Sequence, residues 1–106
     1  MNGFQLKFFT QQDRKHAGLP LAQWLLEEAR RQGVRGATLI TASEGFGKTG
    51  RIHYVHFFEL ADQPQEVTMA VSEDESERIF EAIRQAGVQL FYVKTPIEFG
   101  VTGVDD

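Results

Sequence analysis

The sequence predicts an α+β fold in which a four-stranded sheet carries two helices on one face, in the order βαββαβ. Two observations lead to this prediction. Several stretches alternate apolar residues with the period of a strand, and two stretches repeat them with the period of a helix. The chain has 106 residues, a length that suits one compact core, so we expect a single domain over residues 1–106.

The first half of the chain predicts a strand, a helix and a second strand. Residues 3–10 alternate, with Phe4, Leu6 and Phe8 on one side. Pro20 suits the first position of a helix, and Gly33 suits its end. Between them, the apolar residues at helical spacing are Leu21, Trp24, Leu25 and Ala29. Residues 36–42 then predict the second strand.

Two further strands follow a glycine-rich loop. Residues 51–60 alternate over an unusual length, residues 61–65 are typical of a turn, and residues 66–71 alternate again. Together with the second strand, these segments predict a long central antiparallel ribbon.

The second helix has clear start and stop signals. Ser72 and Glu75 form a capping-box pattern, which accounts for the acidic run 73–75 as helix capping rather than as a metal site, and Gly87 suits the helix end. Residues 88–95 predict the last strand, closed by Pro96. Right-handed crossovers place both helices on one face of the sheet, which is the ferredoxin-like arrangement.

Composition excludes several classes of protein. Eleven basic and fifteen acidic side chains give a net charge of -4, so we expect no nonspecific binding of nucleic acid. The absence of cysteine excludes disulfides and thiolate metal sites. We see neither a secretory signal nor an apolar run of the roughly 18 residues that a membrane span needs. The expected location is therefore the cytoplasm.

The segment ASEGFGKT, residues 42–49, is one substitution from a Walker A loop, because Ala42 stands where the first glycine belongs. In a Walker A loop the lysine leads directly into a helix whose N-terminus faces the phosphates. Here Lys48 leads into a segment with a strand pattern, after Gly50. A small nucleotide hydrolase is therefore a minor alternative, and we expect no catalytic residues.

Both faces of the predicted sheet are apolar. The set expected under the helices is Phe4, Leu6, Phe8, Leu39, Tyr54, Phe58, Val67, Met69, Val71, Leu90 and Tyr92. The set expected on the opposite face is Phe9, Ile40, Val55, Phe57, Ala70, Phe91 and Val93. Since the fold has no further element to cover this second set, we expect a closed oligomer of identical subunits. The alternative is a monomer whose tail residues Ile97, Phe99 and Val101 fold back over that face.

The glycine-rich loop is a candidate anion site. Glycines at 45, 47 and 50 permit positive φ and leave N–H groups free to form a nest. Parallel first and second strands would bring the turn with Arg14, Lys15 and His16 to the same end of the sheet as this loop. The predicted ligand-binding residues are Gly45, Phe46, Gly47, Lys48, Thr49, Arg51, His53 and His16. The alternative is a solvated loop whose glycines only permit a bend.

The histidines give a weaker case for a metal site. His53 and His56 are three apart on a predicted strand, so they face opposite sides and cannot chelate one metal within a chain. His53 could instead meet His16 or a neighbouring subunit. We therefore predict no metal ligand and no cofactor, apart from a nucleotide as candidate ligand.

Several motifs resemble a known family. They are H-x-G-x-P-L at residues 16–21, G-A-T at 36–38, G-F-G at 45–47 and R-I-H at 51–53. Over nearly its whole length the chain resembles the domain of unknown function 190 (DUF190) family. That family is similar to the nitrogen-regulatory P-II (GlnB-like) proteins and, more distantly, to the CutA proteins, which are ferredoxin-like trimers.

The resemblance implies a homotrimer and a role in signalling. P-II proteins bind adenine nucleotides between subunits and signal through a long loop that opens at a G-F-G like residues 45–47. The short turn at residues 86–89 departs from P-II, which carries a second glycine-rich loop there. We therefore expect a non-catalytic P-II-like module that binds a small anionic ligand at inter-subunit clefts and signals to a partner protein. The main alternative is a CutA-like protein that responds to divalent metals through His16 and His53.

Overall fold

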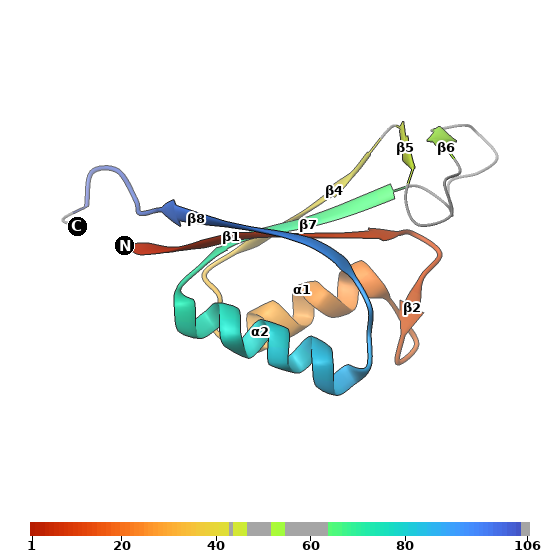
Figure 1. Ribbon diagram of the computed structural model, residues 1–106, viewed down its shortest axis with the longest axis horizontal. Coiled ribbons are helices and arrows are strands. Elements are labelled where there is room, and N and C mark those ends of the chain that lie inside the picture. The colour runs from red at the N-terminus through yellow and green to blue at the C-terminus, as the bar shows by residue number, and fades with distance from the viewer. Residues whose placement is uncertain (43, 47–51, 55–63, 105–106) are drawn as a thin grey trace.

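The computed structural model describes residues 1–42, 44–46, 52–54 and 64–104. It has a four-stranded antiparallel sheet in the order β4-β7-β1-β8, and both helices cover one face of it (Figure 1). The sheet strands and helices are β1 (Asn2–Gln11), α1 (Leu21–Arg31), β4 (Ala37–Thr41), β7 (Pro64–Val71), α2 (Glu73–Ala86) and β8 (Phe91–Glu98). The ferredoxin-like βαββαβ prediction is therefore confirmed.

Two short hairpins add to this sheet. The first pairs β2 (Lys15–His16) with β3 (Leu19–Pro20), and the second pairs β5 (Glu44–Phe46) with β6 (Ile52–Tyr54). Ala17 and Gly18 join β2 to β3 with φ values of 52° and 81°, so both residues of this two-residue turn are left-handed, as a tight hairpin requires. Each hairpin follows the end of a sheet strand.

The core lies between the sheet and the helices. Phe4, Leu6 and Phe8 of β1 stand opposite Val71, Met69 and Val67 of β7. Leu6, Phe8 and all three β7 residues are buried against Leu25 of α1 and Ile79 of α2. Phe4 and Leu90 are partly buried and pack against this core, so seven of the eleven residues predicted for the inner set are confirmed. Leu39 and Tyr92 share this face in the register, but 36% and 51% of their surfaces are exposed because β4 and β8 are the sheet edges. Tyr54 and Phe58 lie outside the residues whose side chains are described.

The helix ends follow their signals, with one shift. The Ser72 hydroxyl accepts a hydrogen bond from the Glu75 N–H at 3.2 Å, and the Glu75 carboxylate accepts one from the Ser72 N–H at 2.8 Å. Gly87 ends α2 with a φ of 71°. Pro20 is the N-cap of α1 rather than its first helical residue, because its ψ of 137° is extended and it pairs with Lys15 in the first hairpin.

Two predicted strands differ from the prediction, one in its pairing and one in its limits. Within the predicted strand 51–60 the described residues form β6, which pairs with β5 and not with the main sheet, and residues 51 and 55–60 lie outside the described part of the chain. β8 runs through Pro96, which was predicted to close it, and Pro96 stands opposite Phe4. Because β8 is an edge strand, the N–H that proline lacks is not needed there.

The face of the sheet opposite the helices, called the open face below, is only partly apolar. Its predicted apolar members with described side chains are Phe9, Ile40, Ala70, Phe91 and Val93, and the pairing register places all five there. However, the same register adds the polar residues Gln5, Lys7, Thr38, Glu66, Thr68 and Thr95. The apolar surface is therefore interrupted. Phe91 and Ile40, which are 72% and 50% exposed, lie in the same row of the sheet, with Phe9 and Glu66 between them. Val55 and Phe57 lie outside the described residues.

The tail does not reach the apolar end of this face, because Ile97 stands opposite Gly3, at the other end of the sheet from Phe91. Phe99 exchanges backbone hydrogen bonds with Met1, at 2.9 and 3.1 Å, so it prolongs the β1–β8 ladder. Beyond it the chain runs past the end of the sheet beside the N-terminus (Figure 1), and Val101 and Val104 are 50% and 62% exposed. The tail therefore leaves the open face uncovered at its apolar end.

Candidate functional site

The glycine-rich segment belongs to the β5–β6 hairpin at one end of the sheet. Gly45 pairs with His53, and Phe46 pairs with Ile52. β5 follows the end of β4 and also contacts β7. Of the predicted ligand residues, Gly47, Lys48, Thr49 and Arg51 lie outside the described part of the chain. The described residues that follow them form a strand, as expected for a hairpin and not for a Walker A loop, whose lysine opens a helix.

The basic turn after β1 lies at the same end of the sheet (Figure 1). The Arg14 carbonyl accepts a hydrogen bond from the Leu21 N–H at 2.8 Å, and the Arg14 Nη2 donates to the Gln89 carbonyl at 2.8 Å. Arg14 thereby joins three segments: the turn, the start of α1 and the connection between α2 and β8. Lys15 is exposed to solvent. As predicted, the elements that carry this turn and the glycine segment, β2 and the β5–β6 hairpin, lie at the same end of the sheet.

His16 faces the helix layer. Its ring meets the Trp24 ring nearly edge-on, with ring centroids 4.9 Å apart. Both rings line a shallow groove of about 1110 Å³ that runs over the helices, together with Glu28 of α1, Ala82 of α2 and Tyr92 of β8. The β2–β3 hairpin contacts α1, whereas β5 contacts β7. Within one subunit, His16 is therefore positioned by α1, and its predicted place beside the glycine segment stays a prediction.

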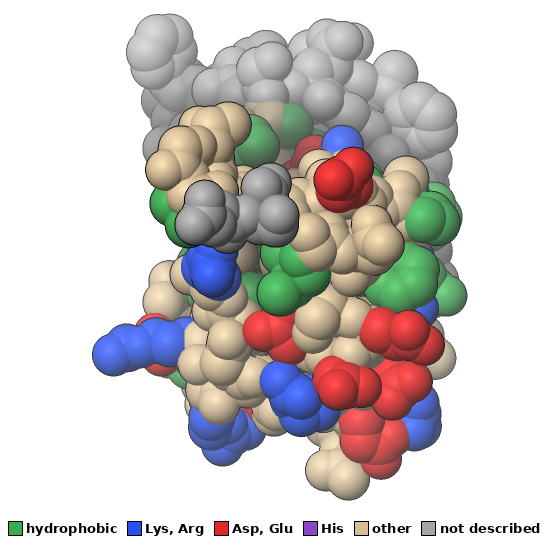
Figure 2. Space-filling view, turned by 90° about the vertical axis from the view of Figure 1, so that its left-hand side faces the viewer, with side chains coloured by type: hydrophobic (Ala, Val, Ile, Leu, Met, Phe, Trp, Pro, Cys, Tyr) green, Lys and Arg blue, Asp and Glu red, His purple; other side chains and the backbone are tan. Residues whose placement is uncertain are grey.

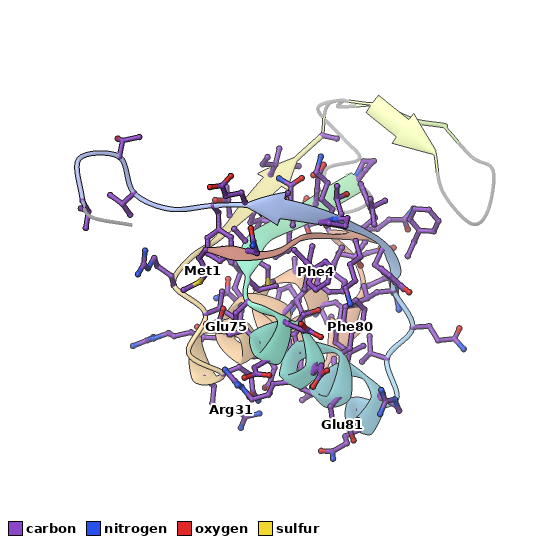
Figure 3. All side chains as sticks on the ribbon, turned by 60° about the vertical axis from the view of Figure 1, so that its left-hand side comes forward. Met1, Phe4, Arg31, Glu75, Phe80 and Glu81 are labelled. Atoms are coloured by element: carbon purple, nitrogen blue, oxygen red, sulfur yellow. The ribbon has the colours of Figure 1, made fainter. Side chains whose placement is uncertain are left out.

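A buried carboxylate also lines this groove, which the sequence analysis did not identify. Glu28 is 4% exposed, and its carboxylate accepts hydrogen bonds from Gln32 at 3.0 Å and from Arg31. Figure 3 shows Arg31 at the C-terminal end of α1, on the side of the molecule away from the sheet. On the face that Figure 2 shows, positive and negative side chains are interspersed over the lower part of the molecule, where the helices lie.

Two buried polar side chains mark the sheet end that carries the hairpins. Thr10 and Gln65 stand opposite each other on β1 and β7, and each is 8% exposed. The Thr10 hydroxyl and the side-chain Oε1 of Gln65 have no hydrogen-bond partner among the described residues. A buried polar group without a partner costs about 1–3 kcal/mol of stability. The sequence analysis did not identify this pair, because threonine and glutamine are common at the ends of strands and nothing in the sequence marks these two as buried.

The described residues give no direct support for a metal centre. Among them, no group of three or more histidine or acidic side chains is arranged to hold a metal ion. The side chain of His53 lies outside the described part of the chain, so its predicted approach to His16 stays a prediction. Within the same described ranges, neither helix is long and apolar enough to cross a membrane.

Solved structures with this fold include nitrogen-regulatory PII-like proteins. CPII from Thiomonas intermedia K12, bound to ADP, AMP and bicarbonate, superposes with a TM-score of 0.68 at 21% identity, over 95% of this chain and 91% of that chain. A putative PII-like signaling protein from Thermus thermophilus gives a TM-score of 0.64 at 17% identity, over 92% and 86% of the two chains. At these identities the likeness establishes the fold.

Sequence comparison identifies the family. A UPF0166 protein of Aquifex aeolicus (strain VF5) is 35% identical over 80 residues, which are 74% of this chain and 76% of that protein. The model of the DUF190 family, described as "Uncharacterized ACR", matches residues 3–97. The chain therefore belongs to the DUF190 family and has the fold of PII-like signalling proteins.

Proposed function

We propose that this protein is a P-II-like regulatory module without catalytic activity. It binds a small anionic ligand at clefts between the subunits of a homotrimer, and ligand occupancy changes its affinity for a partner protein. Adenine nucleotides are the first candidates, because CPII, which shares the fold over 95% of this chain, was solved with ADP, AMP and bicarbonate.

The position of the glycine-rich hairpin carries this proposal. β5 and β6 hold Gly45, Phe46 and His53 at the end of β4, and the turn with Arg14 and Lys15 lies at the same end of the sheet. Backbone N–H groups of a glycine-rich turn and nearby basic side chains are the donors that phosphate and carboxylate groups require. Lys48 and Arg51 add two positive charges to this segment of the sequence.

The cleft between subunits completes the proposed site. Within one subunit, β2 and β3 contact α1 on the helix side, while β5 contacts β7. Because the turn and the β5–β6 hairpin contact different elements within one subunit, we expect their basic groups to come together where the turn of one subunit meets the hairpin of the next. The partly apolar open face supports such an assembly, because a second copy would remove Phe91 and Ile40 from water.

Replacing Lys48 tests the ligand site. We expect Lys48→Ala to weaken binding of ADP by about tenfold to a hundredfold, since a hydrogen bond to a charged group contributes about 1.5–3 kcal/mol. Isothermal titration calorimetry with ADP, AMP and bicarbonate measures the affinities. A thermal shift with each ligand checks them independently, because a ligand that prefers the native state raises the melting temperature.

Arg35→Ala is the matched control for this experiment. Arg35 is exposed and precedes β4, at the end of that strand opposite to β5, so its removal changes the net charge equally without touching the proposed site. Equal ADP affinity of Lys48→Ala and Arg35→Ala would remove Lys48 from the site. Lack of binding by the unsubstituted protein to all three ligands would remove these ligands from the proposal.

A further inference from the structure

A lysine on the helix side of the sheet is held by aromatic rings. Lys94 of β8 stands opposite the buried Leu6 of β1, so its side chain is on the face that carries the helices. The Lys94 Nζ lies 4.1 Å from the centre of the Phe4 ring and 5.7 Å from the centre of the Phe80 ring. Figure 3 shows Phe4 on the sheet next to Phe80 on α2. Cation–π attraction to both rings therefore positions the ammonium.

The aromatic surface continues outward from this lysine. The Phe80 and Tyr92 rings meet nearly edge-on, with centroids 4.8 Å apart, and Phe80 also contacts the core residue Phe8. Tyr92 is 51% exposed, so part of this aromatic surface faces solvent. Phe80, Tyr92 and Lys94 all line the groove of about 1110 Å³ over the helices. The side of the groove formed by β8 thus combines a flat apolar wall with a positive charge.

Lys94 differs from the arginines that line the same groove. Each of these arginines already donates a hydrogen bond to an oxygen of another residue: Arg31 to Glu28, Arg78 to Gln32 and Arg84 to Glu81. The Lys94 ammonium, in contrast, has neither an ion pair nor a hydrogen bond with any described residue. An ammonium carries three donors, so those directed away from the rings are available to an anion.

A buried hydroxyl lies close to this surface. Ser76 is 1% exposed and lines the groove, and its Oγ has no hydrogen-bond partner among the described residues. Because residues four apart lie on one side of a helix, Ser76 is on the same side of α2 as Phe80. A buried hydroxyl without a partner is unfavourable, and an oxygen atom of a ligand would accept its hydrogen bond.

Acidic side chains of α2 limit the charge of such a ligand. Asp74 and Glu77 also line the groove, and neither forms an ion pair with a described residue. Like charges brought together are unfavourable, so these carboxylates disfavour a ligand with several negative groups, such as a nucleotide. A single carboxylate can pair with Lys94 while a flat ring packs against Tyr92 and Phe80.

We propose that the β8 side of this groove binds a small aromatic monocarboxylate. The ligand carboxylate pairs with the Lys94 ammonium and accepts a hydrogen bond from the Ser76 hydroxyl, and the ligand ring packs against Tyr92 and Phe80. Among the described residues, none from the β5–β6 hairpin lines this groove. The site is therefore separate from the anion site of the proposed function and does not depend on it.

Phenylacetate is the test ligand, and isothermal titration calorimetry measures its affinity. We expect Lys94→Gln to weaken its binding at least about tenfold, because a charge-assisted hydrogen bond is lost. Lys94→Arg keeps the positive charge and should keep most of the affinity. Phenylacetamide has the ring without the charge, so it should bind the unsubstituted protein at least about tenfold more weakly than phenylacetate.

Arg35→Gln is the matched control. Arg35 is exposed, precedes β4 at the edge of the sheet opposite to β8, and does not line the groove, while its removal changes the net charge by the same amount. Equal phenylacetate affinity of Lys94→Gln and Arg35→Gln would overturn the site. Equal binding of phenylacetamide and phenylacetate, or no binding of phenylacetate at millimolar concentration, would overturn it as well. Circular dichroism checks that each variant is folded.

Ser76→Ala tests the hydroxyl separately. The melting temperature of the free protein should stay the same or rise, because a buried group without a partner is removed. The rise in melting temperature that phenylacetate causes should become smaller. A lower melting temperature of the free variant with an unchanged phenylacetate shift would assign Ser76 to the fold and remove it from the site.

Competition with ADP separates this site from the proposed function. ADP should leave the affinity for phenylacetate unchanged, and displacement of phenylacetate by ADP would overturn the separate site. A protein that binds phenylacetate through Lys94 but does not bind ADP would retain this site and remove ADP from the proposed function.

Discussion

At the scale of single residues, Gly3 shows how closely two segments approach each other. A Cβ atom at Gly3 would lie 2.0 Å from the backbone oxygen of Val71 and 2.9 Å from Cε1 of Phe99. Contacts this short require the backbone of β1 or β7 to move, since a backbone oxygen cannot turn aside as a flexible side chain can. Position 3 therefore requires glycine because the neighbouring backbone packs so closely, and not because of a positive φ.

We expect Gly3→Ala to lower the free energy of unfolding by about 3 kcal/mol, the upper range for overpacking a well-packed site. Urea unfolding followed by circular dichroism measures this change. Gly36→Ala is the control, because a Cβ at Gly36 meets no atom within 4 Å and Gly36 does not have a positive φ. Equal stability of the two variants would show that the β1–β7 backbone yields without cost.

The sequence predicted the ends of a helix better than it predicted which charged side chain is buried. The pairing of Ser72 with Glu75 and the role of Gly87 could be predicted because capping depends on residues within a few positions of each other. Glu28 could not be recognised in the same way. Its burial depends on where α1 packs and on hydrogen bonds from Gln32 and Arg31, which the helical pattern does not reveal.

At the scale of elements, the N-terminus of α2 depends on the Ser72 hydroxyl. Ser72→Ala should lower the free energy of unfolding by about 1 kcal/mol, because the Glu75 N–H loses its acceptor at the helix start. For a domain of this size, that change corresponds to a fall in melting temperature of roughly 4–8 °C. Differential scanning calorimetry measures it.

Thr102→Ala is the matched control, since Thr102 also carries a hydroxyl but lies in the exposed tail. An equal melting temperature for both variants would mean that solvent replaces the cap at no cost. A selective fall for Ser72→Ala would assign the effect to the helix start.

Element type was predicted better than strand pairing. Alternation over residues 51–60 indicated extended chain, and β6 is extended, but alternation does not say which strand is the partner. β6 pairs with β5, so this part of the predicted ribbon stands apart from the sheet. For the candidate site, the sequence predicted the glycine segment and the basic turn at one end of the sheet. The contact of His16 with Trp24 follows from the β2–β3 hairpin, which the sequence analysis did not identify.

At the scale of the whole molecule, the order of elements was enough to predict the topology. A βαββαβ chain with right-handed crossovers has few compact arrangements, and the observed order β4-β7-β1-β8 is the ferredoxin-like one. The sequence also predicted which side chains point away from the helices. It overstated their apolar character, because Lys7, Glu66 and Thr68 are polar positions between the apolar ones on the same face.

A charge placed on the open face should separate the subunits of the proposed assembly without unfolding them. Phe91 is 72% exposed, so a glutamate there costs the isolated subunit little of its core. In an interface the same carboxylate would be taken out of water beside apolar side chains, which is strongly unfavourable without a partner. We expect Phe91→Glu to raise the dissociation constant by at least about a hundredfold, measured by sedimentation equilibrium.

Val104→Glu controls for the general effect of one more negative charge. Val104 is another exposed apolar residue, at 62%, but it lies in the C-terminal tail after β8. If Val104→Glu dissociates the assembly and Phe91→Glu does not, the open face is not the interface between the subunits. If Phe91→Glu alone dissociates it, the face opposite the helices is the contact surface. The proposed ligand clefts would then lie where neighbouring sheets meet.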